Sequence, residues 1–196
     1  MNQTFKSPFS KHASRNEGTT GRVAAGVAGF GLGLLAGAAR KAAVQAPTYA
    51  AGDWFEGLKA EHKMARALFD KLADTTDEDK PQRAALVLEL QHAIGKHTVE
   101  EEFVIYCVLR DSGEAAQADA LHADHGQLKQ GLWDLEMIGK KQLPGFLERL
   151  AEIRAAFETH VREEEDEIFP RLRETLDKET NTKVTQRMNR EGFKVA

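Results

Sequence analysis

Hydrophobic positions recur at steps of three and four from residue 53 to residue 176, which is the period of α-helices that bury one face. Four such stripes follow one another, and nothing in them alternates like a strand. Their members are Trp54, Leu58, His62, Ala65, Phe69 and Leu72; Leu86, Leu90, Ala93, His97, Glu101, Val104 and Val108; Ala118, Leu121, His125, Leu128, Leu132 and Leu135; and Phe146, Leu150, Ile153, Phe157, His160, Glu164, Ile168 and Leu172. The pattern predicts an all-α fold, an up-down-up-down four-helix bundle over residues 53–176.

Capping residues, prolines and glycines set the expected ends of these helices. Asp53 with Glu56 three residues later is typical of a capping box before the first helix. Pro81 and Pro144 suit the first turns of the second and fourth helices, where no amide hydrogen is needed. Pro170 falls inside the last stripe, so it removes one backbone hydrogen bond and predicts a kink there. Two glycines suit helix ends, Gly113 and Gly139.

Two matching strings place ionisable side chains on the otherwise apolar faces: His97-Thr-Val-Glu-Glu101 and His160-Val-Arg-Glu-Glu164. Residues four apart lie on the same face of a helix, so each string aims an imidazole and a carboxylate in one direction. An unpaired ion in a protein interior costs on the order of several kcal/mol, against a total stability of roughly 5 to 15 kcal/mol. The pattern therefore predicts that a cation lies between these groups.

His62 and His125 bring a further imidazole to the apolar faces of the first and third helices. At about 1.5 Å per residue, counting from the turns at Gly113 and Gly139 places the ionisable groups of antiparallel neighbours at similar heights. Two carboxylates with four imidazoles suit a pair of first-row metal ions, with the carboxylates bridging. The predicted metal ligands are His62, His97, Glu101, His125, His160 and Glu164, with Glu100 and Glu163 as alternatives to the two glutamates.

This order of ligands resembles the hemerythrin-like HHE cation-binding family, and the run from Glu163 to Pro170 is similar to that family's as well. The resemblance covers residues 53–176. It implies a hemerythrin-like four-helix bundle that holds two iron ions in a non-haem centre, bridged by Glu101 and Glu164 with the four histidines as terminal ligands. It also implies a coordination position open to O2, peroxide or nitric oxide.

Oxygen-carrying members of that family use five histidines, two of them four residues apart on the third helix, and a final aspartate five residues beyond its histidine. Here Leu121 stands four residues before His125, and the nearest substitute is His122. Without His122 as a ligand, the centre is poorer in histidine and more open. The resemblance therefore favours redox reactivity, sensing or iron handling over reversible O2 carriage.

Other functions and other metals fit parts of the pattern. Ferritin-like bundles place a glutamate three residues before a histidine. None of the predicted histidine ligands has one, since the residues at that spacing are Lys59, Ile94, His122 and Phe157. Manganese or zinc could take the same ligand types as iron. The alternative functions are an iron storage or buffering module without turnover and a helical interaction scaffold.

Charge and cysteine content limit the possible functions and the cellular compartment. The chain has a formal net charge of −4 and a pI near 6.0, and no basic patch is interleaved with aromatic residues, which argues against nucleic-acid binding. Its single cysteine, Cys107, cannot form an internal disulfide, which fits a cytoplasmic protein. The aromatic residues expected mainly to pack are Trp54, Phe69, Phe103, Tyr106, Trp133, Phe157 and Phe169.

The first fifty residues differ in composition from the rest. A polar leader is expected over residues 1–21 and an additional Gly/Ala-rich helix over residues 22–46, which contains seventeen uncharged residues from Val23 to Ala39. Glycines at four-residue spacing give this helix a smooth strip that suits a partner helix or an oligomer mate. They are Gly29, Gly33 and Gly37.

Membrane association of this segment is the rival interpretation, although seventeen helical residues cover only about 26 Å of a roughly 30 Å hydrocarbon core. A cleaved signal peptide is disfavoured because Arg40 and Lys41 follow the apolar run. At the other end of the chain, residues 177–196 are polar and charged, and a short solvated helix with a frayed end is expected there.

Overall fold

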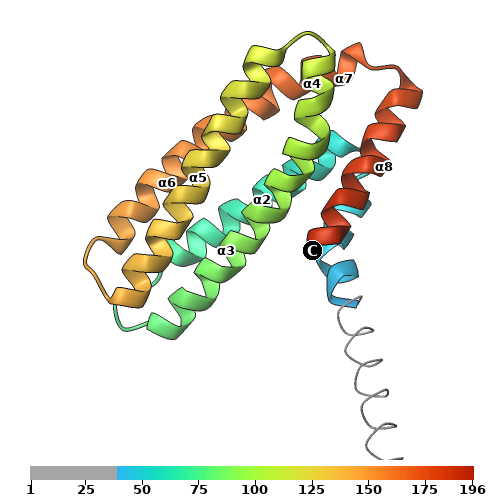
Figure 1. Ribbon diagram of the computed structural model, residues 1–196. Helices are drawn as coiled ribbons and strands as arrows, with labels where there is room; N and C mark the ends of the chain where they lie inside the picture. Colours follow the sequence, from blue (N-terminus) through green and yellow to red (C-terminus); the bar gives the residue numbers. More distant parts are fainter. Residues whose placement is uncertain (1–38) are drawn as a thin grey trace, which may run out of the picture. The chain divides into compact units, whose positions relative to one another are not determined.

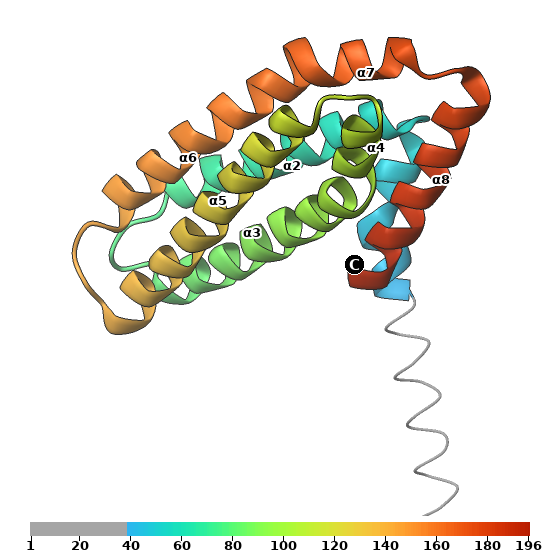
Figure 2. The same cartoon turned by 45° about the horizontal axis from the view of Figure 1, so that its top comes forward.

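In the computed structural model, which describes residues 39–196, every regular element is helical (Figure 1). Four long helices surround the interior: α2 (Trp54–Ala73), α3 (Lys80–Glu100), α5 (Ala115–Lys141) and α6 (Phe146–Glu163). α2 packs against α3 and α6, and α5 packs against the same two helices, so the four enclose a shared interior. Figures 1 and 2 show them side by side, joined by short turns.

Two of these helices continue through a π-helical segment, which the sequence did not predict. η1 (Glu101–Ile105) joins α3 to α4 (Tyr106–Asp111), and η2 (Glu164–Ile168) joins α6 to α7 (Phe169–Thr175). In each, an amide donates to the carbonyl five residues earlier, from Tyr106 to Glu101 and from Phe169 to Glu164. Single π turns inside α-helices are uncommon and frequently lie at functional sites.

The predicted kink at Pro170 takes the form of this π segment. The backbone changes its hydrogen bonding from Glu164 onward, and Pro170 stands in the first turn of α7, where its missing amide hydrogen is tolerated. Proline is not the common cause, because α4, the helix that follows η1, contains none. What the two segments share is their first residue, the glutamate that ends each His-x-x-x-Glu string.

The helix ends agree with the sequence at three places. The carboxylate of Asp53 accepts a hydrogen bond from the amide of Glu56 at 3.1 Å and caps α2. Pro81 lies in the first turn of α3. Gly113 follows α4 with a φ of 91°, a left-handed conformation that glycine adopts without strain.

Two predicted helix ends are wrong. α5 runs past Gly139 to Lys141, and Gln142 takes the left-handed position with a φ of 53°. Pro144 precedes α6 rather than opening it, because Gly145, with a φ of 90°, makes the turn and serves as the N-cap. Both differences lie in the turn between α5 and α6, where the sequence offers two glycines and a proline within seven residues.

The interior consists of two apolar clusters with a polar layer between them. One cluster includes Phe69, Leu90, Leu128 and Phe157, and the other includes Trp54, Leu58, Leu121 and Phe169. On each long helix the apolar line passes from one cluster to the other through the predicted ligands; on α2, for example, His62 lies between Leu58 and Ala65. The predicted ligands therefore occupy a common level.

The end of the chain differs from expectation. Residues 178–195 form α8 (Lys178–Val195), a regular helix that packs against α3, η1 and α2, rather than a solvated helix with a frayed end. Asp177 caps it by accepting from the amide of Thr180 at 2.7 Å. Its buried face carries Val184, Met188, Asn189 and Gly192.

α8 lies beside a helix over residues 39–50, which we call α1 and which the figures draw in blue without a label (Figures 1 and 2). Lys41 Nζ donates to the carbonyl of Phe193 at 3.2 Å. The helix predicted over residues 22–46 is described only from residue 39; the polar leader and the strip Gly29, Gly33 and Gly37 lie outside the described residues. Within residues 39–196, no helix combines the length and the apolar character needed to cross a membrane.

The contact between α5 and α6 gives a stability prediction. A Cβ at Gly131 would lie 2.7 Å from Cγ1 of Ile153, whereas one at Gly139 would meet nothing within 4 Å. We expect Gly131→Ala to lower the free energy of unfolding by about 1 to 3 kcal/mol through overpacking. Gly139→Ala should leave it unchanged or raise it by up to about 1 kcal/mol. Denaturant titration of the full chain measures both, and equal effects would contradict the packing.

Candidate metal centre

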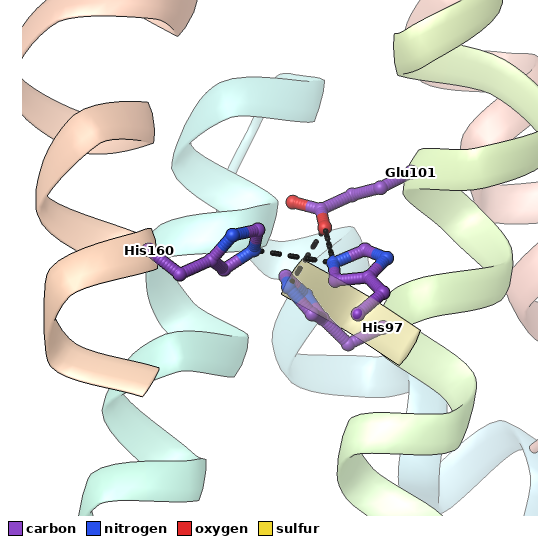
Figure 3. A group of neighbouring side chains, drawn as sticks. His97, Glu101 and His160 are labelled. Carbon is purple, nitrogen blue, oxygen red and sulfur yellow. Dashed lines mark hydrogen bonds and ion pairs between the residues drawn. The ribbon is translucent and has the colours of Figure 1, made fainter. Parts of the chain in front are cut away.

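All six predicted ligands come together inside the bundle, and none of them is more than 5% exposed. Their nitrogen and oxygen atoms form two overlapping groups that could hold metal ions, each with all its ligand atoms within 4.8 Å of one another. Figure 3 shows how His97 and Glu101, from one helix, point toward His160 on the facing helix. The two groups are His62, His97, Glu101 and Glu164, and His97, Glu101, His125 and His160.

The histidines form two pairs. Nε2 of His62 on α2 lies 3.1 Å from Nε2 of His97 on α3, and Nε2 of His125 on α5 lies 3.1 Å from Nε2 of His160 on α6. Two nitrogens that each bind one ion at about 2.1 Å, at right angles, are about 3 Å apart. Each pair is therefore spaced as two ligands of a single ion.

The carboxylates lie between the two pairs. Oε2 of Glu101 is 3.0 Å from Nε2 of His97 and 3.1 Å from Nε2 of His125. Oε2 of Glu164 is 3.5 Å from Nε2 of His62 and 3.3 Å from Nε2 of His160. Each carboxylate thus reaches one histidine of either pair, which is the position that a bridging carboxylate requires.

Tyr106 is a site residue that the sequence analysis missed, since it was expected mainly to pack. Its buried hydroxyl donates to Oε1 of Glu164 at 2.8 Å and lies 3.2 Å from Oε2 of Glu101 and 3.1 Å from Nε2 of His125. Burial and the charges of the two glutamates raise the pKa of Tyr106 well above its ordinary value, so the phenol stays protonated. Two other expected packing residues, Phe103 and Trp133, are more than half exposed.

The π turn explains why Tyr106 was missed. In an α-helix a residue five positions on is rotated about 140° from the first, so Tyr106 would point away from the face of Glu101. In η1 the amide of Tyr106 donates to the carbonyl of Glu101, which closes a wider turn. The tyrosine consequently lies at the same level as the glutamate.

Each histidine also has an acidic side chain behind it. The outward nitrogen Nδ1 faces a carboxylate oxygen in every case: Glu165 at 2.8 Å from His62, Glu61 at 3.4 Å from His97, Glu102 at 3.0 Å from His125 and Asp124 at 3.6 Å from His160. Such partners fix the ring orientation and leave Nε2 free to face the centre. We call these four residues the outer carboxylates.

The outer carboxylates follow a repeated rule in the sequence. Glu61 and Asp124 each directly precede a histidine of the centre, and Glu102 and Glu165 each directly follow a glutamate of the centre. The sequence analysis did not identify Glu102 and Glu165 as site residues, although both contact histidines of the centre. An acidic residue next to a predicted ligand is visible in the sequence at all four places. Which histidine each acidic residue faces depends on how the helices pack, and the sequence alone does not give that.

The alternative ligands lie elsewhere. Glu100 is buried but contacts Lys96 and Gln45, on the side away from the centre, and Glu163 is exposed. The side chain of His122 is 60% exposed, and its nearest acidic contact is Glu102 at 3.9 Å from Nδ1. His122 therefore lies outside the group of six.

Electrostatics separate the two central carboxylates. Burial alone would raise the pKa of Glu101, but the charge of His97 and hydrogen bonds from His125 and His97 outweigh it and hold that pKa well below its ordinary value. Burial and the charge of Glu101 raise the pKa of Glu164 well above its ordinary value. Burial also lowers the pKa of His160 to about 3. Without a cation, the interior accommodates only one of the two negative charges.

The donor set fits a pair of metal ions. Among the described residues, Oε1 of Glu101 and Oε2 of Glu164 are buried and have no hydrogen-bond partner. Buried polar atoms without partners are rare, and a cation between the two histidine pairs would satisfy both of these. Imidazole nitrogens and carboxylate oxygens together suit divalent first-row metals.

A helical bundle whose buried layer gathers four histidines and two glutamates belongs to the class of helical metal-binding proteins. The family model described as the hemerythrin HHE cation binding domain matches residues 55–186, which is more than half of the chain and contains all six residues. The chain belongs to this family, as the resemblance predicted. Comparison with curated proteins gives no match.

The role of the outer carboxylates can be tested at Glu165, with the exposed Glu163 as the matched control. We expect Glu165→Gln to weaken metal retention by about ten- to a hundredfold, because His62 loses the charged partner of its Nδ1. Glu163→Gln, two residues away on the exposed face, should change nothing. Metal retained against increasing chelator concentrations measures this, and equal retention by both variants would contradict the role of Glu165.

Proposed function

We propose that this chain is a non-haem di-iron protein, folded as an up-down-up-down four-helix bundle, that binds or senses O2 or reacts with peroxide or nitric oxide. In this proposal His62 and His97 would hold one iron, His125 and His160 would hold the other, and Glu101 and Glu164 would serve both. The observation that carries it is that each carboxylate lies within 3.5 Å of one histidine from either pair. When bound, the irons would supply redox-active ions with coordination positions that the six side chains leave free.

Tyr106 makes the two sides of the centre different. Its protonated hydroxyl contacts His125 and Glu164. A hydrogen-bond donor therefore lies on the side of the His125–His160 pair. The ring of Phe157 lies edge-on to His62, at 6.1 Å between centroids, and forms part of the apolar wall that keeps water from the opposite side. A small ligand would meet a hydrogen-bond donor on one side and an apolar wall on the other.

The number of histidines supports reactivity or sensing rather than reversible O2 carriage. Leu121, at the position where a fifth histidine would stand, is 1% exposed and packs in an apolar cluster. The exposed His122 does not replace it. Fewer nitrogen ligands leave more of the coordination sphere to an incoming molecule.

A small cavity supports access for a molecule of this size. It has a volume of about 370 Å3, lies between α5 and α6, and reaches His160. Ala155 and Ala156 form part of its lining and keep it open because their side chains are short. Asp124, the outer carboxylate of His160, stands at the same cavity.

Metal analysis of the purified chain tests the proposal directly. We expect two irons per chain, and an absorption spectrum that changes on addition of O2, peroxide or nitric oxide. His97→Ala and Glu164→Ala should each lose iron because both ligands are buried and central, whereas His122→Ala should retain both irons. Manganese or zinc at the same stoichiometry would correct the identity of the metal and keep the site.

The same preparation separates the alternative functions. Steady consumption of hydrogen peroxide by the iron form, absent from the metal-free form, would exclude an iron storage or buffering module. Retention of both irons by His97→Ala would count against the ligand assignment. A chain that holds no stoichiometric metal would leave the interaction scaffold as the better interpretation.

A further inference from the structure

A second group of buried polar side chains lies beside the centre, between the bundle and the helices α1 and α8. Each of its six members is at most 6% exposed, and they come from α1, α2, α3 and α8. Their middle is a lysine held between two carboxylates. We call the group the Lys96 network: Gln45, Thr48, Glu61, Lys96, Glu100 and Asn189.

Hydrogen bonds connect the members in a continuous path. Nζ of Lys96 donates to both oxygens of Glu100 at 2.9 Å and also to Oε1 of Glu61. Nε2 of Gln45, on α1, lies 3.1 Å from Oε1 of Glu100 and 3.1 Å from Oδ1 of Asn189 on α8. The path therefore runs from α8 through α1 to α3 and α2.

The path ends on the metal centre. Thr48, on α1, donates to Oε1 of Glu61 at 2.6 Å, and the other oxygen of Glu61, Oε2, lies 3.4 Å from Nδ1 of His97. Glu61 is thus held by α1 and Lys96 on one side and faces a predicted ligand on the other. A change in the orientation of Glu61 would therefore alter the contact with Nδ1 of His97.

The other outer carboxylates have no comparable support. Glu102 is bonded by Lys129 and Glu165 by Arg66, and both of these cations are one-third exposed or more. The side chain of Asp124 is itself 41% exposed, whereas that of Glu61 is 4% exposed. Within residues 39–196, Glu61 is the only outer carboxylate whose partners are all buried and come partly from outside the four-helix bundle.

The fit of α8 on this network is close. A Cβ at Gly192 would lie 1.7 Å from Oε1 of Glu100, so the backbone of α8 rests directly on that carboxylate and any larger residue would displace it. A buried charge cluster connected by hydrogen bonds tends to hold a single arrangement, because each broken contact leaves an uncompensated charge. Docking of α1 and α8 therefore fixes Glu100, and through Lys96 it fixes Glu61.

We propose that α1 and α8 position His97 through the Lys96 network, so that their docking sets how tightly the His62–His97 side of the centre holds its metal. This rests on the proposed function in that the centre must bind metal. Residues of the network act as positioning residues, since none but Glu61 approaches a predicted ligand. Among the described residues, no member of the Lys96 network forms a hydrogen bond or ion pair with His125 or His160, the histidines on the other side of the centre.

Two substitutions in the network and one matched control test this. Asn189→Ala removes the α8 contact with Gln45, and Thr48→Val removes the hydroxyl bonded to Glu61 while keeping the shape of the side chain. Val184→Ala, on the same helix as Asn189 and also buried, removes apolar packing without touching the network. The full chain loaded with Co2+ is challenged with a chelator, and its visible absorption follows the release.

We expect release in two phases. Asn189→Ala and Thr48→Val should each accelerate one phase by about tenfold and leave the other unchanged, and Val184→Ala should alter neither. Acceleration of both phases alike, or the same acceleration by Val184→Ala, would overturn the proposal, because the effect would then be general loosening of the fold.

A second readout does not depend on metal. In 15N-histidine NMR spectra of the metal-free chain, we expect the ring signals of His97 to shift in Asn189→Ala and Thr48→Val and to stay unchanged in Val184→Ala. Unchanged His97 signals in both network variants would refute the positioning role. If the chain takes up no Co2+, the proposed function fails, and these spectra alone decide whether the network reaches His97.

Discussion

Two carboxylates buried a few ångströms apart are the constraint on which the structure depends. Glu101 and Glu164 cannot both be ionised in an apolar interior unless a positive charge stands between them. Four imidazoles surround them, each oriented by an acidic group behind it, and an apolar cluster closes the layer on either side. The helices can be understood as the means of bringing these groups to one level and of keeping water out.

The π turns are part of the same solution. Each begins at a central glutamate and inserts a wider turn just where the side chains must converge. The wider turn of η1 presents Tyr106 to the centre, while Val104 and Ile105 within η1 lie in the apolar cluster. An uninterrupted α-helix would place either the tyrosine or the apolar residues correctly, but not both.

The sequence predicted the parts of this site that depend on a single helix. His97 with Glu101 and His160 with Glu164 were found because residues four apart always lie on the same face of an α-helix. Features that depend on packing between distant segments were missed. Tyr106 required a one-residue change in hydrogen bonding that has no compositional signature. The buried face of α8 was missed because the polar tail contains few apolar residues, and beside Val184 and Met188 this face consists of an asparagine and a glycine.

The outer carboxylates carry a further implication. Within the hairpin of α2 and α3, and again within that of α5 and α6, the acidic residue before one histidine supports the histidine of its partner helix. Glu102 and Glu165 instead support histidines of the opposite hairpin. Each hairpin thus supports one of its own histidines and one histidine of the other hairpin, with acidic residues at equivalent positions. A centre of this design needs only one helical hairpin that associates with a copy of itself, so gene duplication and fusion of a short ancestor would suffice to build it.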